Sequence, residues 1–532
     1  MTDHTFRVPR RSDTIVWWTM PNTSLVNRLL RLVHEIARAR RILRDLPLAS
    51  GDFLGRRLDW ARRISGNSSK PVDLFNSKGG MRMMIRRMAV AGWLVGSCAV
   101  LGSRCSAQDD VSRMEQVVQS YVSSKQFMGS VLVARDQTIV LDKGYGFANL
   151  EWNVPNSPTT KFRLGSITKQ FTSASIFLLE ERGKLKVDDP VKKYMPDAPG
   201  AWDKVTIFNL LTHTSGIPSF TGFPDYASTE AIPTTPEKLV ARFRDKPLEF
   251  QPGEKWNYSN SGYVLLGYLI EKISGQPYAN FVQENIFVPL GMKDSGYDSN
   301  SAVILRRASG YSPGATGQVN AGYIDMSIPL SAGGLYSTAE DLLRWERGLF
   351  GGKLLSSASL QKMTTPFKND YACGLAVRTV KGLKLIEHGG GIEGFNTQLS
   401  YYPDEKLTVV VLGNLNGSSP GEIASKMAAL VHGEKVVLTE EQKEIVVPAK
   451  ILTEYVGSYE LGPGVTFVVT LEGDQLITQI TGQPKVPIFA ESETMFFPKV
   501  VDAEIEFFKN EKGQVTHLVL HQGGRDSKAL KK

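Results

Sequence analysis

The stretch FRLGSITKQFTSASIFLLEERGKL, residues 162–185, raises the question on which the interpretation of this sequence depends. Ser166 follows a glycine where an extended segment gives way to an apolar helical pattern, and Lys169 comes three residues later. A serine at a helix start is ordinarily an N-cap, whose hydroxyl satisfies a free backbone N–H. It can also be a nucleophile, because residues i and i+3 are neighbours on a helix and a buried lysine can lose its proton and act as base.

The Ser-x-x-Lys spacing does not decide this question by itself. Ser359 and Lys362 repeat it in a segment typical of an ordinary helix surface. A second polar group stands before the helical pattern of WNYSNSGYVLLGYLI, where Tyr258 and Asn260 are two residues apart. A tyrosine near a lysine ammonium loses its proton more easily and can shuttle it, and an amide can orient a substrate carbonyl. Taken alone, Tyr-x-Asn is more often a core tyrosine with a capping asparagine, and Tyr278 begins the same pattern.

A third segment, IEHGGGIEGF, places His388 and three glycines, Gly389 to Gly391, at the end of a predicted strand. Glycines let a backbone approach a ligand closely and direct its N–H groups at it. An enzyme of acyl transfer needs two such donors for its oxyanion. His-x-Gly recurs by chance at His521, so the order of the three motifs along the chain is what decides.

The order Ser-x-x-Lys, Tyr-x-Asn, His-x-Gly resembles that of the serine β-lactamase and penicillin-binding-protein superfamily. The resemblance is closest to class C lactamases, D,D-peptidases and related esterases, and it extends to LLTHTSGIPSF and SAGGLYSTAEDLLRW. The tail from Tyr455 resembles a β-rich domain that often follows such hydrolase domains. The resemblance therefore covers nearly all of the chain after residue 107.

By position, the resemblance implies that Ser166 is acylated and that Lys169 and Tyr258 handle protons. Asn260 is then expected to hold the substrate amide. The resemblance therefore implies a serine hydrolase that passes through an acyl-enzyme.

In the third motif, the resemblance implies that His388 and Gly390 line the strand beside the ligand. The backbone N–H groups of Ser166 and Gly391 are expected to form the oxyanion hole. Family β-lactamases usually carry Lys-Thr-Gly here, in which lysine is a permanent cation for a substrate carboxylate. His388 is instead a mostly neutral imidazole and Gly389 lacks the threonine hydroxyl, which weakens the β-lactamase interpretation.

Strand patterns at both ends of a helical middle predict the fold. GSVLVARDQTIVLDKGYGFAN, with a turn at Arg135, is typical of a hairpin, and strand patterns return in LKLIEHGG, FNTQLSYYPDEK and LTVVVLGNLN. We expect an α/β (α+β) domain over residues 108–438, with an antiparallel sheet flanked by helices in which the terminal strands pair. A linker at 439–450 and a small all-β, barrel-like domain at 451–532 complete the expected organisation.

Charge is concentrated in the first part of the chain. Residues 1–107 hold 19 Lys and Arg against 7 Asp and Glu, which leaves 43 basic and 47 acidic residues in the remainder. The net charge of +8 therefore gives no reason to expect nucleic-acid binding by the folded part. No cofactor signature and no metal-site spacing occur, and His213 in LLTHTSG is expected to support a turn.

Residues 81–107 have the pattern of a secretory signal peptide. Arginines precede an apolar run of about fifteen residues, and small residues follow at Cys105-Ser106-Ala107. An uncleaved membrane anchor and a lipoprotein signal at Cys98 are the alternatives. Because such a signal must begin near the N-terminus, we expect residues 1–80 to be a mis-assigned start, or else a disordered or helical extension. An exported protein, periplasmic or secreted, is predicted, and a single later cysteine, Cys373, leaves it without an internal disulfide.

The sequence thus predicts an exported serine hydrolase that acts on an amide or ester, of D,D-peptidase, D-aminopeptidase or esterase type. One alternative is a true β-lactamase. Another is a sensor that binds penicillin or muropeptides without turnover. The expected partner is a small-molecule or peptide substrate, such as a cell-wall peptide, with membrane contact only through an uncleaved signal.

Overall fold

The computed structural model describes residues 110–532 apart from 439–440, 463, 502 and 523–524. The predictions for residues 1–107 lie outside these residues. Within the described part of the chain, no helix combines the length and the apolar character needed to cross a membrane.

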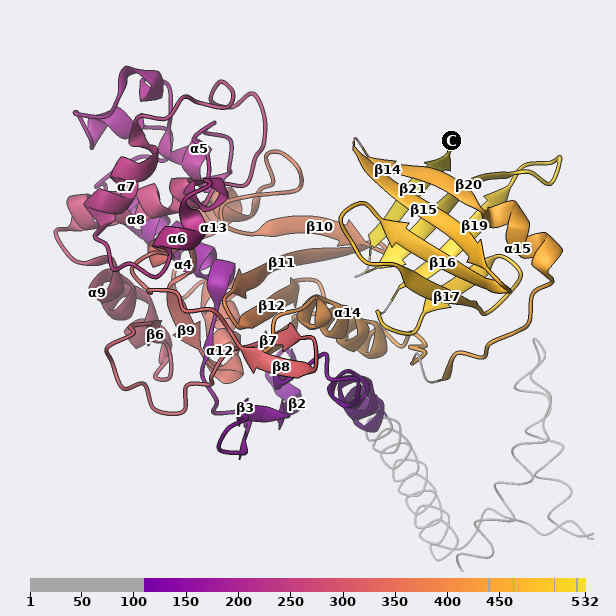
Figure 1. The fold of residues 1–532 in the computed structure, drawn as a ribbon. Helices are drawn as coiled ribbons and strands as arrows, with labels where there is room; N and C mark the ends of the chain where they lie inside the picture. Colours follow the sequence, from indigo (N-terminus) through magenta and orange to yellow (C-terminus); the bar gives the residue numbers. More distant parts are fainter. Residues whose placement is uncertain (1–109, 439–440, 463, 502, 523–524) are drawn as a thin grey trace, which may run out of the picture. The chain divides into compact units, whose positions relative to one another are not determined.

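A six-stranded antiparallel sheet forms the centre of the first domain, in the order β10-β11-β12-β13-β1-β2 (Figure 1). Its strands are β1 (Gly129–Arg135), β2 (Thr138–Tyr145), β10 (Ala376–Val380), β11 (Leu383–Ile392), β12 (Phe395–Tyr402) and β13 (Leu407–Gly413). The predicted hairpin is β1–β2. Pairing of β1 with β13, from Gly129 opposite Gly413 to Arg135 opposite Leu407, joins the two ends of the domain in one sheet, as the sequence predicts.

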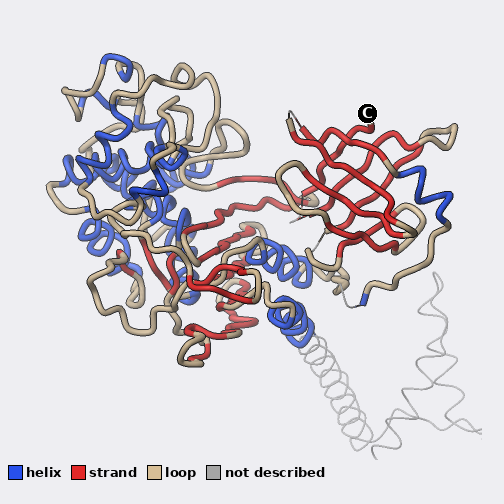
Figure 2. Tube along the Cα trace, viewed as in Figure 1, coloured by secondary structure: helices blue, strands red, loops and turns tan. Residues whose placement is uncertain are grey.

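The helical middle is inserted between β2 and β10, and Figure 2 shows it as a separate set of helices and loops. Its helices are α4 (Thr168–Glu181), α5 (Ile207–Leu211), α6 (Tyr226–Thr229), α7 (Pro236–Arg244), α8 (Asn260–Ser274), α9 (Tyr278–Val282), α10 (Val288–Leu290), α11 (Leu330–Gly333), α12 (Ala339–Phe350) and α13 (Ser357–Thr364). Short strands connect them: β3 (Phe147–Asn149), β4 (Val154–Pro155), β5 (Phe162–Arg163), β6 (Gly296–Tyr297), β7 (Tyr311–Gly314), β8 (Gly317–Asn320) and β9 (Leu335–Ser337).

Strands β1 and β13 are apolar on both faces because helices cover both. Leu132 and Val410 belong to the hydrophobic cluster on the side of α4, α8 and α12. Val131 and Val409 belong to the cluster formed with residues 110–123, which are helical, and with α14 (Ser419–Val431). Successive side chains of a strand point to opposite faces, so a strand buried on both faces becomes a continuous apolar run such as LTVVVLG.

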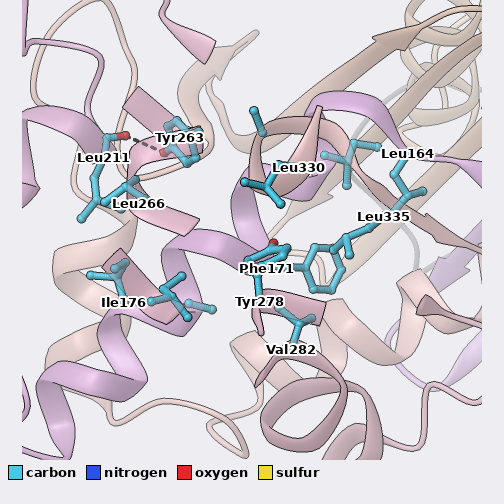
Figure 3. Packing of buried hydrophobic residues seen from close by; sticks show 14 of the residues in the cluster. Leu164, Phe171, Ile176, Leu211, Tyr263, Leu266, Tyr278, Val282, Leu330 and Leu335 are labelled. Atoms are coloured by element: carbon cyan, nitrogen blue, oxygen red, sulfur yellow. Dashed lines mark hydrogen bonds between the residues drawn. The ribbon is translucent and has the colours of Figure 1, made fainter. Parts of the chain in front are cut away.

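The core beneath α4 is dense and also contains satisfied polar groups. Figure 3 shows Phe171 of α4 close to Tyr278 and Leu335, all of them buried. In the same view the Tyr263 hydroxyl donates to the Leu211 carbonyl, at 2.6 Å. This packing fixes the start of α4, which carries Lys169 and directly follows Ser166.

The C-terminal domain is a closed antiparallel barrel, as expected. It follows α15 (Ala449–Tyr455) and comprises β14 (Gly457–Gly462), β15 (Val465–Glu472), β16 (Gln475–Ile480), β17 (Val486–Ala490), β18 (Met495–Pro498), β19 (Glu504–Lys509), β20 (Val515–Gln522) and β21 (Arg525–Lys531). Tyr459, Phe467, Phe507 and Leu518 are buried in its interior. Alternation of these inward residues with exposed polar ones produces the period-two pattern of the sequence.

A buried acid in α12 makes the stability of the first domain sensitive to pH. Burial raises the pKa of Glu346 to about 8, and its Oε2 has no hydrogen-bond partner among the described residues. The unfolded chain has the ordinary value of 4.5, so stability decreases as pH rises from about 4.5 to about 8. We expect Glu346→Gln to raise the free energy of unfolding by about 1–3 kcal/mol at pH 8 in urea denaturation.

The gain from Glu346→Gln should shrink toward pH 5, where the native carboxyl is already protonated. Glu340→Gln, on the exposed side of the same helix, removes a surface ion pair with Arg344 and should change stability by no more than about 0.5 kcal/mol. A gain for Glu346→Gln that is equal at pH 5 and pH 8 would rule out proton uptake as its cause.

Candidate active site

The backbone around Ser166 is not that of an ordinary N-cap. A 3-10 turn, η1 (Gly165–Ile167), precedes α4, which begins at Thr168, and the Ser166 hydroxyl caps neither element. Gly165 has φ +55°, in the left-handed region that glycine adopts without strain. The turn leaves Ser166 partly exposed while Lys169 and the other residues of α4 as far as Leu179 are buried.

Two polar groups converge on the Ser166 hydroxyl oxygen. Lys169 Nζ lies 3.0 Å from it, and the Tyr258 hydroxyl donates to it at 2.8 Å. Lys169 comes from the next turn of the same helical segment, and Tyr258 comes from the loop before α8. The two predicted proton-handling residues therefore lie within hydrogen-bond distance of the predicted nucleophile.

Lys169 is fully buried, and burial holds its pKa well below the usual 10.5. Nζ also lies 2.9 Å from Asn260 Oδ1 and 2.8 Å from the Ala332 carbonyl oxygen, both of which can only accept. A neutral amine has two N–H bonds and one lone pair. With its hydrogens directed at those two oxygens, its lone pair is directed at Ser166, as a base for the hydroxyl proton requires.

Tyr258 differs from the expectation that a neighbouring lysine makes its proton easier to lose. Burial raises the pKa of the Tyr258 hydroxyl well above 10, because its desolvation outweighs the hydrogen bond to Ser166. Tyr258 is therefore a protonated donor in the resting site. Its ring packs against His213, with 4.3 Å between ring centroids, and His213 Nδ1 accepts the Ser259 N–H, which is consistent with the predicted support of a turn.

Asn260 has protein partners at both ends of its amide. Its Oδ1 accepts from Lys169, and its Nδ2 donates to Thr221 Oγ1 at 3.1 Å. The structure thus directs the amide oxygen at the lysine, and the expected contact of Asn260 with a substrate amide stays a prediction. Asn260 is the first residue of α8. The residue before it, Ser259, is the N-cap of that helix, and its hydroxyl caps the first turn.

His388 is buried and faces Tyr371. Its Nδ1 lies 2.6 Å from the Gly389 carbonyl oxygen, and its Nε2 lies 2.9 Å from the Tyr371 hydroxyl. Burial, with a smaller contribution from Lys169, lowers the pKa of His388 to about 4. The ring is neutral above that pH, as expected for a site without the family lysine.

The third motif lies directly against the turn that carries the nucleophile. A Cβ on Gly390 would lie 1.9 Å from the Leu164 carbonyl oxygen, and a Cβ on Gly165 would lie 2.8 Å from the Gly391 nitrogen. Thr397 on β12 donates its hydroxyl to the same Leu164 oxygen at 2.8 Å. Only glycine allows this approach, which places the two expected oxyanion donors, the N–H groups of Ser166 and Gly391, on adjoining backbone.

An open cleft of about 420 Å³ lies over these groups. Its lining residues are all polar or small and include no Asp, Glu, Lys or Arg. They are Ser166, Tyr258, His388, Gly389, Gly390, Gly391, Asn396, Thr397, Gln398, Gly417, Ser418, Pro420 and Gly421. Among the described residues, no cluster of three His, Cys, Asp or Glu side chains is arranged to hold a metal ion.

The repeated motifs lie elsewhere and have structural roles. Lys362 in α13 is exposed and forms an ion pair with Glu180, and Ser359 N–H donates to the capping Ser356. Tyr278 is a core residue hydrogen-bonded to Thr172. Neither of these two repeats lies at the site; the repeat at His521 includes Gly523, which lies outside the described residues.

Tyr371 was not singled out from the sequence, nor was Thr221. Tyr371 lies in the loop before β10, in FKNDYACG, and contacts the site from a position that matches no motif. The only local signal is Asn369-Asp370, two residues tolerant of left-handed backbone, which both adopt it. That signal marks a turn and gives no indication of a site.

Comparison with known proteins agrees with this geometry. The family model described as Beta-lactamase matches residues 114–434, and Domain of unknown function (DUF3471) matches residues 441–530. Penicillin-binding protein 4* of Bacillus subtilis (strain 168) is 30% identical over 454 residues, which are 80% of this chain and 99% of that protein. The chain belongs to the beta-lactamase family and is a serine hydrolase of the superfamily that includes the penicillin-binding proteins.

Solved structures show the same relationship. The octameric penicillin-binding protein homologue from Pyrococcus abyssi is 29% identical, with TM-score 0.57, and covers 79% of this chain and 100% of its own. A D-stereospecific amidohydrolase from Streptomyces sp. is 26% identical, with TM-score 0.53, and covers 61% of this chain and 99% of its own. The part of this chain that the amidohydrolase covers is about as long as the hydrolase domain alone.

Proposed function

We propose that this protein hydrolyses amide or ester bonds through an acyl-enzyme on Ser166. The observation that carries the proposal is the Ser166 hydroxyl held between the buried amine of Lys169 and the hydroxyl of Tyr258. The substrate class is that of a D,D-peptidase, D-aminopeptidase or esterase. A relative described as a D-stereospecific amidohydrolase supports an amide of a D-amino acid in particular.

In the acylation step, Ser166 Oγ attacks the substrate carbonyl carbon while its proton passes to the neutral Lys169 amine. The carbonyl oxygen becomes an oxyanion and accepts hydrogen bonds from the backbone N–H groups of Ser166 and Gly391. Tyr258 gives its proton to the leaving nitrogen or oxygen as the bond to carbon breaks, and regains one from the Lys169 ammonium. A water then attacks the acyl-enzyme with the same groups acting in reverse order.

The cleft favours amides and esters without a carboxylate beside the scissile bond over β-lactams. A β-lactamase binds the carboxylate of its substrate, and none of the residues lining this cleft is a permanent cation. His388 is neutral above pH 4 and occupies the position of the family lysine. We therefore keep β-lactam hydrolysis, and penicillin binding without turnover, as the alternatives that an experiment distinguishes.

We further propose that residues 81–107 export the protein to the periplasm or medium and that residues 1–80 lie before the native start. The folded protein would then consist of the hydrolase domain at 108–438, a linker at 439–450 and the barrel at 451–532. N-terminal sequencing of the protein from its native cells tests this, and a peptide from residues 1–80 in the mature protein would contradict it.

Intact-mass spectrometry over time tests the proposed chemistry. The full chain is incubated with a penicillin, a D-alanyl-D-alanine peptide, a D-amino acid amide and a simple ester, beside Ser166→Ala and the matched variant Ser359→Ala. We expect transient mass increases and product release in the wild type and Ser359→Ala, and neither in Ser166→Ala. A lasting penicillin adduct without turnover of any substrate indicates a binder, penicillin hydrolysis a β-lactamase, and turnover by Ser166→Ala refutes the proposal.

A further inference from the structure

The two hydrogen bonds of the His388 ring determine which nitrogen carries its proton. A carbonyl oxygen can only accept, so the nitrogen 2.6 Å from the Gly389 oxygen, Nδ1, must be the donor. In the neutral ring Nε2 is then an acceptor, and the Tyr371 hydroxyl at 2.9 Å donates to it. Both ring nitrogens therefore have protein partners, and neither is free to donate to a substrate.

The groups around this ring disfavour a positive charge on it. The rings of Tyr258, before α8, and Tyr371, before β10, pack against it, and Lys169 of α4 and His213, after α5, are close enough to interact with it electrostatically. The carboxylate of Glu387, the preceding residue of β11, belongs to the other face of that strand, where Arg378 and Gln398 bind it. The groups in contact with His388 thus offer hydroxyl and aromatic partners and no negative charge.

We propose that Tyr371 determines specificity as a positioning residue: by donating its hydroxyl to His388 Nε2, it keeps this wall of the cleft neutral and excludes substrates with a carboxylate beside the scissile bond. This inference rests on the proposed hydrolase function and makes it narrower. The preferred substrates are those with an amide, an ester or a continuing peptide at that position. A free terminal carboxylate there would lose its water without gaining a cationic partner.

Lys169 does not replace the missing cation. Its amine already has Ser166, Asn260 and the Ala332 carbonyl as partners. The cleft lining likewise includes no arginine or lysine side chain. Within this cleft, selection against a carboxylate therefore depends on the charge state of one imidazole, which is buried and which accepts the Tyr371 hydroxyl.

The test compares two substrates that differ only at their end, a peptide ending in D-alanyl-D-alanine and its C-terminal amide. kcat/KM is measured for both between pH 5 and pH 9 in the wild type, Tyr371→Phe and a matched control, Tyr401→Phe, whose residue lies on β12 and packs against Phe350. We expect the wild type and the control to prefer the amide at least tenfold, with a ratio that changes less than twofold above pH 6. In Tyr371→Phe the preference should fall at least fivefold between pH 8 and pH 5.5, because His388 then accepts a proton.

A readout independent of turnover is the imidazole nitrogen NMR spectrum of His388 in the full chain, assigned by comparison with His388→Gln. We expect the neutral Nδ1–H form down to pH 5.5 in the wild type and protonation at higher pH in Tyr371→Phe. Equal loss of kcat on both substrates with an unchanged ratio and spectrum would reduce Tyr371 to a structural role. If neither peptide is hydrolysed, the proposed hydrolase function is wrong for these two substrates. The NMR spectra then decide the role of Tyr371 by themselves: an unchanged His388 spectrum in Tyr371→Phe overturns it.

Discussion

Lys169→Met is expected to lower kcat/KM on any substrate of this protein by about 10³-fold or more. The methionine side chain has nearly the length of the lysine and fits an apolar site, but it has no lone pair of comparable basicity to take the Ser166 proton. The loss should appear in kcat, because the amine has no direct contact with the cleft. Steady-state kinetics with single-turnover acylation by intact mass measure it.

Two controls make the Lys169 result specific. Lys362→Met removes an exposed lysine of the repeated Ser-x-x-Lys spacing and should change kcat/KM by no more than about twofold. In the wild type, kcat/KM should fall as pH is lowered, because the base acts only when unprotonated. Since burial holds the pKa of Lys169 well below 10.5, that fall should begin far below the range of an ordinary lysine. Activity that rises only near pH 10 would contradict this assignment.

Gly390→Ala is expected to have the second large effect. The new Cβ would lie 1.9 Å from the Leu164 carbonyl oxygen and 2.3 Å from Thr397 Oγ1, so β11 must move away from the turn that carries Ser166. A displacement of about 1 Å between nucleophile and oxyanion donors costs about 10²-fold in rate. We also expect the free energy of unfolding to fall by about 1–3 kcal/mol. Kinetics and urea denaturation of the same preparation measure both effects.

Gly389→Ala is the matched control for the stability effect. Its Cβ would meet the end of the flexible Gln398 side chain at 3.1 Å, and a small shift of that side chain relieves the contact. The unfolding free energy should therefore change by less than about 0.5 kcal/mol. If Gly390→Ala were as stable and as active as the wild type, the close approach of β11 to Leu164 would not be needed.

Local spacing was enough to predict part of this site. Ser166 and Lys169 come together because Lys169 follows Ser166 by three positions on one helical segment, and any fold that keeps the helix keeps the pair. The hairpin of β1 and β2 and the barrel strands follow in the same way from alternation and turns. Burial on both sheet faces also explains why the apolar runs of β13 could be recognised without knowing its neighbours.

The remaining features depend on contacts that no local pattern encodes. Tyr371 reaches His388 from a loop whose residues indicate only a turn. The direction of the Asn260 amide and the high pKa of Tyr258 both follow from burial around the lysine, which depends on how the helices pack. Sequence order could identify which residues meet, but only packing determines whether each one faces the substrate, its neighbour or the core.

The position of β13 in the sheet also has a consequence for when this enzyme becomes competent. β13 lies between β12 and β1, so β12 and β13 together connect the β1–β2 hairpin, which is made first on the ribosome, to β11, the strand that carries Gly391. Ser166 and Lys169 leave the ribosome early, yet their oxyanion donor at Gly391 is held in place only after Gly413 has been synthesised and paired. Because such distant pairing is slow to form, the nascent chain carries a nucleophile without catalytic power until the domain closes.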